Sequence, residues 1–176
     1  NGKALSTEYS SFYNKGTDVS LADGKLTGWT KTDLWTVGVN EDGTYTFSTS
    51  EGKKLSMQDT YGSMPLESDK ATHSDWSVTA VTGKTNTYYI DNVYRAAVKD
   101  ETNYRMQWNT RTGTLNWSTY NGTGELFEQQ FYLVVDSGSD EKPDPTPEPT
   151  TVPISTALAG KKDASFTVKG VVTLVD

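Results

Sequence analysis

The motif Leu34-Trp35-Thr36-Val37 decides the fold, because motifs of the same kind return twice along the chain. They are Asp75-Trp76-Ser77-Val78 and Gln130-Phe131-Tyr132-Leu133. In each motif a large aromatic residue precedes an aliphatic residue by two positions, and in a strand such a pair points to one face of the sheet. The three motifs therefore predict three strands that bring Trp35, Trp76 and Phe131 into a shared core.

Two further segments recur between these motifs. Gly2-Lys3-Ala4-Leu5-Ser6 returns as Gly52-Lys53-Lys54-Leu55-Ser56, and Thr44-Tyr45-Thr46-Phe47 returns as Thr87-Tyr88-Tyr89-Ile90. Copies about 40 residues apart indicate that one small group of strands is used several times. We expect three such units within residues 1–135, with Arg95-Ala96-Ala97-Val98 in the place that Lys and Leu take in the earlier units. The body is therefore predicted to be all-β, without a long helix before residue 154.

The composition favours strands and argues against a nucleic-acid partner. Hydrophobic residues make up 34% of the chain and aromatic residues 11%, a bias that suits half-buried strand surfaces. The net charge is -7, but residues 136–153 hold five acidic residues against one lysine, so more than half of the excess lies there. The body is only mildly acidic and has no basic stripe, so we expect it to bind no nucleic acid directly.

Residues 136–153 have the composition of a linker. Pro143, Pro145, Pro147 and Pro149 occupy every second position, with Thr and acidic residues between them. Alternating prolines favour an extended chain, and the repulsion of like charges extends it further. Because a linker joins folded parts, residues 154–176 are expected to begin a second, truncated β domain. The alternating segment 164–176 would be its first strand, which cannot bury its own apolar face alone.

Three features of the chain bear on its compartment. It contains no cysteine, which excludes disulfides and thiol chemistry. No run approaches the roughly 18 apolar residues of a membrane span. The chain opens on Asn1 with no initiator Met, so we expect a fragment whose targeting signal could lie upstream.

Little in the sequence predicts catalysis. His73, the single histidine, stands near Asp75 in a polar segment that lacks the nucleophile turn of a Ser-His-Asp hydrolase. One histidine and no cysteine argue against a zinc site. The plentiful carboxylates stand beside turn residues, where Asp commonly caps the backbone, although their number leaves an acid pair of the glycosidase kind open. We therefore assign no catalytic residue, metal or cofactor.

Binding through aromatic side chains is the better prediction, because aromatic faces stack on sugar rings while amides bond the hydroxyls. The richest segment is 104–120, where Tyr104, Met106 and Trp108 share one strand face and are expected to form core. The candidate ligand-binding residues are Trp117, Tyr120, Trp29, Tyr61, Arg105, Gln107 and Asn109.

Two known families share parts of this pattern. Three strand units, each closed by an aromatic, resemble a β-trefoil, and Gln129-Gln130-Phe131 resembles the Gln-x-Trp signature of ricin-type lectins with Phe in place of Trp. The corresponding Asp33-Leu34-Trp35 and Ser74-Asp75-Trp76 lack that glutamine. The resemblance implies a β-trefoil-like body built from three strand repeats.

A second resemblance covers most of the chain. Residues 33–47, residues 52–57 and Phe131-Tyr132-Leu133-Val134 resemble an accessory domain of large secreted proteins from gut Firmicutes. In that family the domain lies beside OB-like domains and hydrolase modules of the endonuclease/exonuclease/phosphatase or 5'-nucleotidase type. The segment 166–173 is similar to the first strand of such an OB-like domain. The resemblance implies an extracellular or cell-surface location and carries over no catalytic residue.

Three functions follow from these patterns. The first is a non-catalytic module of a multidomain extracellular bacterial protein that binds a glycan through exposed aromatics or positions neighbouring domains of the same chain. The second is a purely structural spacer attached to a secreted nuclease or phosphoesterase-type hydrolase. The third, and the least supported, is an independent hydrolase.

Overall fold

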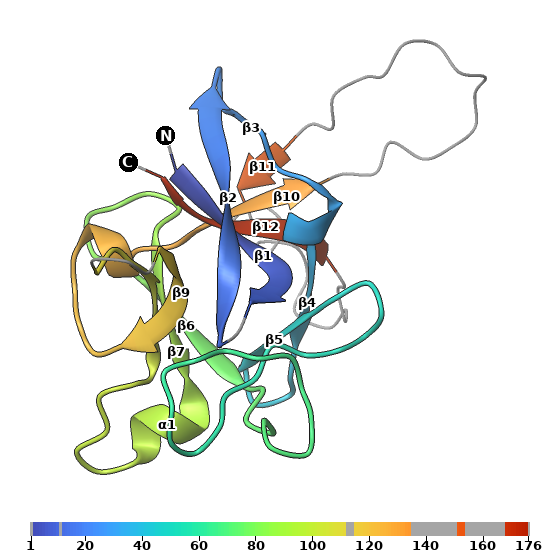
Figure 1. Cartoon of the computed structure of the whole chain (residues 1–176). Coiled ribbons are helices and arrows are strands. Elements are labelled where there is room, and N and C mark those ends of the chain that lie inside the picture. Colours follow the sequence, from blue (N-terminus) through green and yellow to red (C-terminus); the bar gives the residue numbers. More distant parts are fainter. Residues whose placement is uncertain (1, 11, 112–114, 135–150, 154–167, 176) are drawn as a thin grey trace.

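A computed structural model of the chain describes residues 2–10, 12–111, 115–134, 151–153 and 168–175. In this part of the chain the protein is all-β, as the sequence predicts. Antiparallel strands form one large sheet that closes into a ring (Figure 1). Its described helices are short, and none is long and apolar enough to cross a membrane.

The elements follow the repeated motifs of the sequence, so that a strand begins at or beside each aromatic. The strands are β1 (Gly2–Ser10), β2 (Tyr13–Ala22), β3 (Lys25–Thr27), β4 (Trp35–Val39), β5 (Tyr45–Ser48), β6 (Trp76–Ala80), β7 (Tyr88–Asn92), β8 (Arg105–Asn109), β9 (Asn116–Tyr120), β10 (Gln130–Val134), β11 (Thr151–Pro153) and β12 (Val168–Val175). The helical segments are η1 (Lys31–Asp33), α1 (Val93–Ala97) and η2 (Glu125–Phe127).

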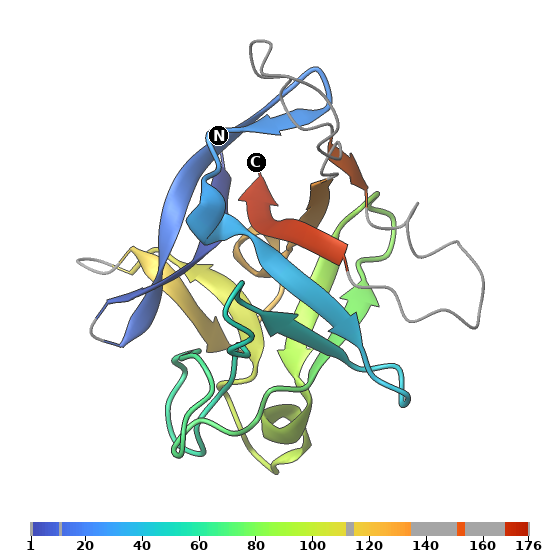
Figure 2. The ribbon, with the colours of Figure 1, turned by 90° about the vertical axis from the view of Figure 1, so that its right-hand side faces the viewer.

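The pairing of the strands closes the ring. Neighbours pair in the order β1-β2-β9-β8-β7-β6-β5-β4-β12-β10-β11, and β1 also pairs with β12 (Figure 2). β3 lies off this path and pairs with β2. The ring therefore closes at β12. In this strand Val172 faces Phe131 of β10, and Gly170 faces Trp35 of β4.

Strand β12 lies in the range that the sequence assigns to a second domain, and it pairs with strands of the body. Most of the expected linker, residues 136–153, lies outside the described residues. Its described part, Thr151–Pro153, forms β11 and pairs with β10. The domain boundaries at residues 135 and 153 stay a prediction.

The core contains the three aromatics that the sequence places there. Trp35 and Trp76 are fully buried and Phe131 nearly so, and all three belong to one cluster of buried side chains. The Phe131 ring stacks on Phe47 of β5, with 5.9 Å between the ring centroids. The prediction of a shared aromatic core is confirmed.

The recurrence of Leu5 and Leu55 corresponds to a recurring contact. The indole nitrogen of Trp35 donates to the main-chain oxygen of Leu5 at 2.9 Å, and that of Trp76 donates to Leu55 at 3.1 Å. Both leucines are fully buried. Each indole therefore satisfies a carbonyl that water does not reach, which makes the tryptophan specific at its position.

The expectation for Arg95-Ala96-Ala97-Val98 is corrected, because this segment does not continue the strand repeat. It lies in and directly after the short helix α1. The side chain of Asn92 caps the helix by accepting the Arg95 N–H at 3.1 Å, and alanine and arginine are strong helix formers. Arg95 is buried, donates to the Gln58 carbonyl at 2.9 Å and pairs with Glu101.

Candidate functional site

The hairpin of β8 and β9 carries most of the sequence-predicted site residues. Gln107 faces Ser118 and Trp108 faces Trp117 across the two strands. The predicted alternation is confirmed for Met106 and Trp108, which are buried, while Gln107 is half-buried on the opposite face. Tyr104, also expected in the core, is half-buried and lies before β8. The polar face of β8 is therefore only partly covered by the rest of the protein.

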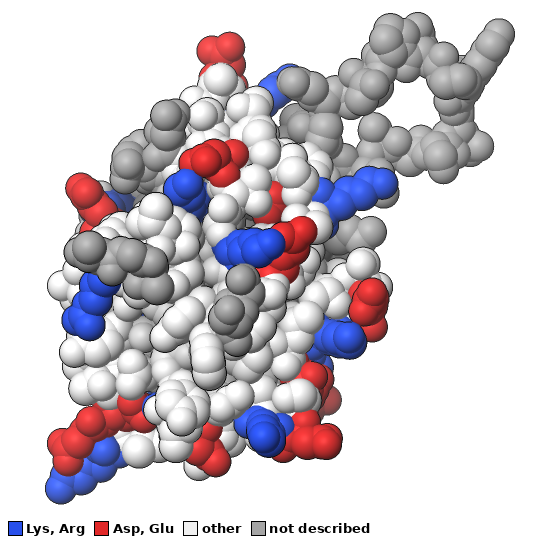
Figure 3. All heavy atoms as spheres, viewed as in Figure 1, with Lys and Arg blue, Asp and Glu red and all other residues white. Residues whose placement is uncertain are grey.

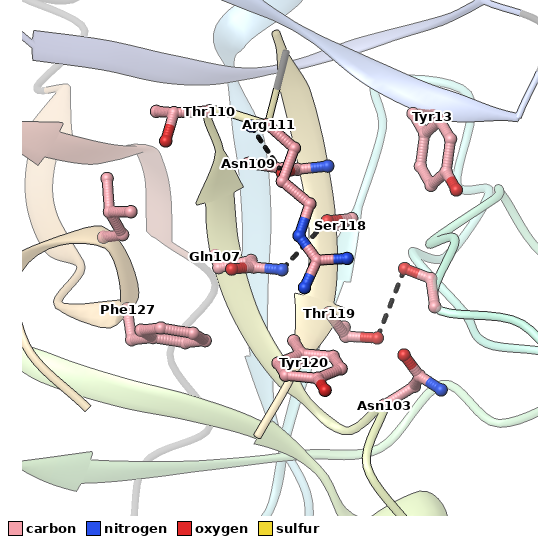
Figure 4. A pocket seen from close by; sticks show the side chains of 12 residues that line it. Tyr13, Asn103, Gln107, Asn109, Thr110, Arg111, Ser118, Thr119, Tyr120 and Phe127 are labelled. Carbon is pink, nitrogen blue, oxygen red and sulfur yellow. Dashed lines mark hydrogen bonds between the residues drawn. The ribbon is translucent and has the colours of Figure 1, made fainter. Parts of the chain in front are cut away.

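A pocket of about 370 Å³ opens over this polar face (Figure 4). It is bounded by the hairpin, the chain after β8, one residue of β2, the segment η2 and two loops. The lining residues are Tyr13, Gly62, Asn103, Gln107, Asn109, Thr110, Arg111, Ser118, Thr119, Tyr120, Leu126 and Phe127. Amides and hydroxyls thus share the pocket with aromatic rings, and these lining residues include no Asp, Glu or His.

The polar groups of the pocket are held by contacts among themselves. Gln107 donates through Nε2 to the Ser118 hydroxyl at 3.4 Å, and Asn109 accepts the main-chain N–H of Arg111 at 3.0 Å through Oδ1. The Arg111 guanidinium lies over the Tyr120 ring, 5.6 Å from its centroid (Figure 4). The Tyr120 side chain is 38% exposed at the pocket rim.

One loop closes against the hairpin through a glycine. The carbonyl of Gly62 accepts the Thr119 N–H at 2.7 Å and the Thr119 hydroxyl at 3.2 Å. A Cβ at position 62 would lie 2.7 Å from the Thr119 carbonyl oxygen and 2.9 Å from Oδ1 of Asn103. Only glycine lets the loop come this close, so Gly62 fixes one wall of the pocket.

Arg105 stands beside the pocket and is engaged in the fold. Its guanidinium makes a two-pronged contact with Asp91 at 2.7 and 2.8 Å and donates to the Gly122 carbonyl at 2.9 Å. The Tyr89 ring covers it at 4.1 Å. The hydrogen bonds to Asp91 hold the pKa of Arg105 above its ordinary value despite partial burial. Arg105 therefore ties β7 to β8 and does not line the pocket.

The expectation that Trp117 presents its ring to a ligand is corrected. Trp117 is fully buried, packs edge-on against Trp108 with 5.7 Å between centroids, and donates its indole N–H to the Ala4 carbonyl at 3.1 Å. Trp29 is half-buried and packs on a second cluster that includes Val19 and Leu26. Neither tryptophan lines the pocket.

Tyr61 lies next to the pocket in a row of aromatic rings. It is 57% exposed and meets Phe12 edge-on at 6.4 Å between centroids. Phe12, which is 59% exposed, lies 6.5 Å from the ring of Tyr13, a lining residue of the pocket. The aromatic row Tyr61, Phe12 and Tyr13, in which Tyr61 and Phe12 are exposed and Tyr13 is half-buried, therefore lies beside the pocket.

Of the seven sequence-predicted residues, the structure brings Gln107, Asn109 and Tyr120 together in the pocket. Sequence reasoning missed Asn103, Arg111, Ser118 and Tyr13, which come from separate segments. Arg111 and Ser118 sit within the segment 104–120 that the sequence singles out, so the hairpin pairing could have found them. Nothing in the local sequence places Tyr13 or Asn103 there.

The single histidine is away from the pocket lining. The Nε2 atom of His73 lies 2.8 Å from Asp59, and its ring stacks on Tyr94 at 3.6 Å. Asp75, its neighbour in sequence, instead accepts from Asn40 at 3.0 Å. Over the described residues, no group of three or more His, Asp or Glu side chains is placed to hold a metal ion.

The charged side chains of the surface are mixed in sign. On the face seen in Figure 3, basic and acidic residues lie beside one another, and no broad patch of one sign is formed. Exposed pairs such as Lys15 with Glu8, at 2.9 Å, contribute to this pattern.

Comparisons of the chain with protein-family models, with curated proteins and with solved structures find no match. The fold and the pocket therefore carry the functional argument alone.

Proposed function

We propose that the body is a non-catalytic carbohydrate-binding module of a multidomain extracellular bacterial protein, and that the ligand is a glycan held in the pocket over β8 and β9. The observation that carries this proposal is the pocket lining: the amides of Gln107 and Asn109 meet hydroxyl groups and the rim ring of Tyr120 in one place. Amides bond sugar hydroxyls, and aromatic edges and faces contact the C–H surface of the ring.

We also propose that the body, completed by strand β12, is a β-trefoil. Six strands pair in a smaller ring, β12-β4-β5-β6-β7-β10, in which the bridge from Tyr88 to Gln129 joins β7 to the residue before β10. The aromatic motifs lie in β4, β6 and β10. In two of the units an indole N–H donates a hydrogen bond to a leucine carbonyl. In the third unit, Nε2 of Gln129 donates to the Met106 carbonyl at 3.5 Å. Three related contacts around one ring support the threefold arrangement.

The proposal is tested by retention on a panel of immobilised glycans. Gln107→Ala and Asn109→Ala each remove one amide from the pocket, and we expect each to weaken retention about threefold to tenfold, the effect of one neutral hydrogen bond. Asn121→Ala is the matched control, because Asn121 is an exposed amide directly after β9 that does not line the pocket. Retention that is unchanged in both pocket variants would reject this site.

The alternative is a structural spacer without a ligand, beside a secreted nuclease or phosphoesterase-type module. It is favoured by the burial of Trp117 and by the engagement of Arg105 with Asp91, which remove two of the predicted binding groups from the surface. If the body is a spacer, wild-type protein is retained on no glycan of the panel, even though circular dichroism shows that this protein is folded.

A further inference from the structure

We propose that the ligand of the pocket is a linear chain of β-1,4-linked glucose or xylose units, and that units beyond the pocket stack on the aromatic row of Tyr61, Phe12 and Tyr13. The inference rests on the proposed glycan binding and names the chemical class of the ligand of that same site. Its starting point is the position of the row, which begins at the pocket lining and continues beyond it.

The aromatic row is continuous with the pocket at two points. Tyr13 lines the pocket, and its ring lies 6.5 Å from that of Phe12. Tyr61 directly precedes the lining residue Gly62, and its ring meets Phe12 at 6.4 Å between centroids. Phe12 and Tyr61 are not among the described lining residues. A ligand confined to the pocket therefore leaves their rings uncovered, whereas a chain that continues past Tyr13 reaches them.

Phe12 and Tyr61 keep open apolar surface despite their mutual contact. The two rings meet at an interplanar angle of 64°, and more than half of each side chain is nevertheless exposed. Exposed apolar surface that is gathered in one place marks binding sites. A sugar that covers these rings removes their surface from water, which favours stacking.

Hydrogen bonds hold the segments that carry the two rings. The Tyr9 hydroxyl donates to the main-chain carbonyl of Phe12 at the end of the β1–β2 hairpin. Directly after Tyr61, the carbonyl of Gly62 accepts the two hydrogen bonds from Thr119 that tie this loop to β9. Because the main chain beside both rings is held before a ligand arrives, little conformational freedom is lost when a sugar stacks on them.

The placement of polar and apolar groups favours sugars whose hydroxyls lie around the edge of the ring. In the view of Figure 4 the rings of Tyr13 and Phe127 lie on opposite sides of Gln107 and Ser118. A β-linked glucose or xylose unit has equatorial hydroxyls, so both of its faces consist of C–H groups. Its edge bonds amides and hydroxyls while its faces contact aromatic rings. In a β-1,4-linked chain successive units are turned over, and each still offers a C–H face to the row.

The test is a chain-length series, measured by isothermal titration calorimetry with the whole chain. The probes are cellobiose, cellotetraose and cellohexaose, and the xylose oligosaccharides of the same lengths. We expect the hexasaccharide of at least one series to bind at least about tenfold more tightly than its disaccharide, because each of two stacked rings contributes a factor of about three.

Variants separate stacking on the row from the larger number of registers in which a long chain binds. The double variant Phe12→Ala/Tyr61→Ala should lower the ratio of hexasaccharide to disaccharide affinity about tenfold. Tyr61→Phe, which keeps the ring and removes the hydroxyl, should preserve the ratio. Leu21→Ala is the matched control and should also preserve it, because Leu21 is an exposed apolar side chain near the other end of β2.

Four results would overturn the inference and leave glycan binding intact. The first two are an affinity ratio that is equal in wild type and the double variant, and an equal fall of the ratio in Leu21→Ala. The third is retention of other glycans without binding of either oligosaccharide series. The fourth is a wild-type dimer in analytical ultracentrifugation that the double variant does not form, since a second copy would then cover the row. Absence of binding to every glycan would instead reject the proposed function itself.

Discussion

Three buried tryptophans, Trp35, Trp76 and Trp117, donate their indole N–H groups to main-chain carbonyls. Each side chain therefore fills the core and also satisfies an acceptor that is removed from water, two tasks that phenylalanine cannot combine. This dual task explains why a tryptophan in the candidate binding segment, Trp117, is part of the core instead of the ligand surface.

Replacement of a core tryptophan by phenylalanine should destabilise the protein by more than the lost side-chain volume alone would. We expect Trp76→Phe to lower the free energy of unfolding by about 2 to 4 kcal/mol, because the Leu55 carbonyl loses its donor in a buried site and a small cavity remains. Urea denaturation followed by fluorescence measures the change. Trp29→Phe is the control, because Trp29 is half-buried in the smaller cluster, and a loss there equal to that of Trp76→Phe would contradict the role of the indole bond.

The ion pair of Glu101 and Arg95 should make stability depend on acid pH. Burial tends to raise the pKa of Glu101, but the N–H groups of Asn103 and Thr102 and the Arg95 guanidinium outweigh it, so the pKa lies below its ordinary value of 4.5. The ionised carboxylate therefore stabilises the fold above pH 4.5, and this contribution is lost as the pH falls through the lowered pKa.

Glu101→Gln tests this dependence. We expect the variant to be less stable than wild type by about 2 to 4 kcal/mol at pH 7, because Arg95 is left buried without its counter-charge. The difference should shrink as the pH is lowered below the ordinary pKa of a carboxylate, since wild-type Glu101 then becomes protonated as well. A difference that stays constant down to the lowest pH at which both proteins fold would contradict the ionic origin.

Among the elements, the loop around Gly62 and the β8–β9 hairpin form the pocket together. We expect Gly62→Ala to push the loop from the hairpin, because its Cβ would meet the Thr119 carbonyl oxygen at 2.7 Å. Glycan retention should fall along with stability. Gly43→Ala is the matched control: Gly43 has φ 83° in an open turn, so alanine should cost about 1 kcal/mol of stability and leave retention unchanged. Equal glycan retention by Gly62→Ala and Gly43→Ala would show that the loop around Gly62 does not form part of the glycan site.

Local sequence signals predict the elements where the chain is regular. The turn Asn40-Glu41-Asp42-Gly43 joins β4 to β5, and its Asp-Gly pair is a hairpin signal in the sequence because glycine there takes a positive φ. The alternation of residues 105–109 correctly separates the buried from the half-buried face of β8. Helix α1 was missed, because a helix of one turn leaves no periodic signal and depends on the cap at Asn92. The pocket was found only in part, since Tyr13 and Asn103 reach it through long-range packing.

At the scale of the whole molecule, β12 closes the ring of the described sheet, because it pairs with β1, β4 and β10. Its residues Val172 and Leu174 belong to the main core cluster, and Val171 belongs to the second cluster. The repeats of the sequence predict strands and a common core, but they carry no information on which late segment completes the ring, because that choice depends on pairing across more than 100 residues.

The place of β12 is tested by a charge in its buried face. We expect Val172→Asp to destabilise the protein by about 3 to 5 kcal/mol, because an unpaired carboxylate would enter the aromatic core beside Phe131. Val39→Asp is the control on the neighbouring strand β4, where the side chain is 50% exposed, and should change stability by about 0.5 kcal/mol or less. Equal thermal unfolding midpoints for Val172→Asp and Val39→Asp would contradict the place of β12 in the core.

An NMR titration of the isotope-labelled chain with a glycan that it retains tests the binding account most directly. We predict that the main-chain amides of Asn109, Ser118 and Tyr120 and the side-chain Nε–H of Arg111 shift together, while the indole N–H signals of Trp35, Trp76 and Trp117 stay in place because they are buried and hydrogen-bonded. Shifts that centre on Trp29 or on the buried indoles, with the pocket signals unmoved, would contradict it.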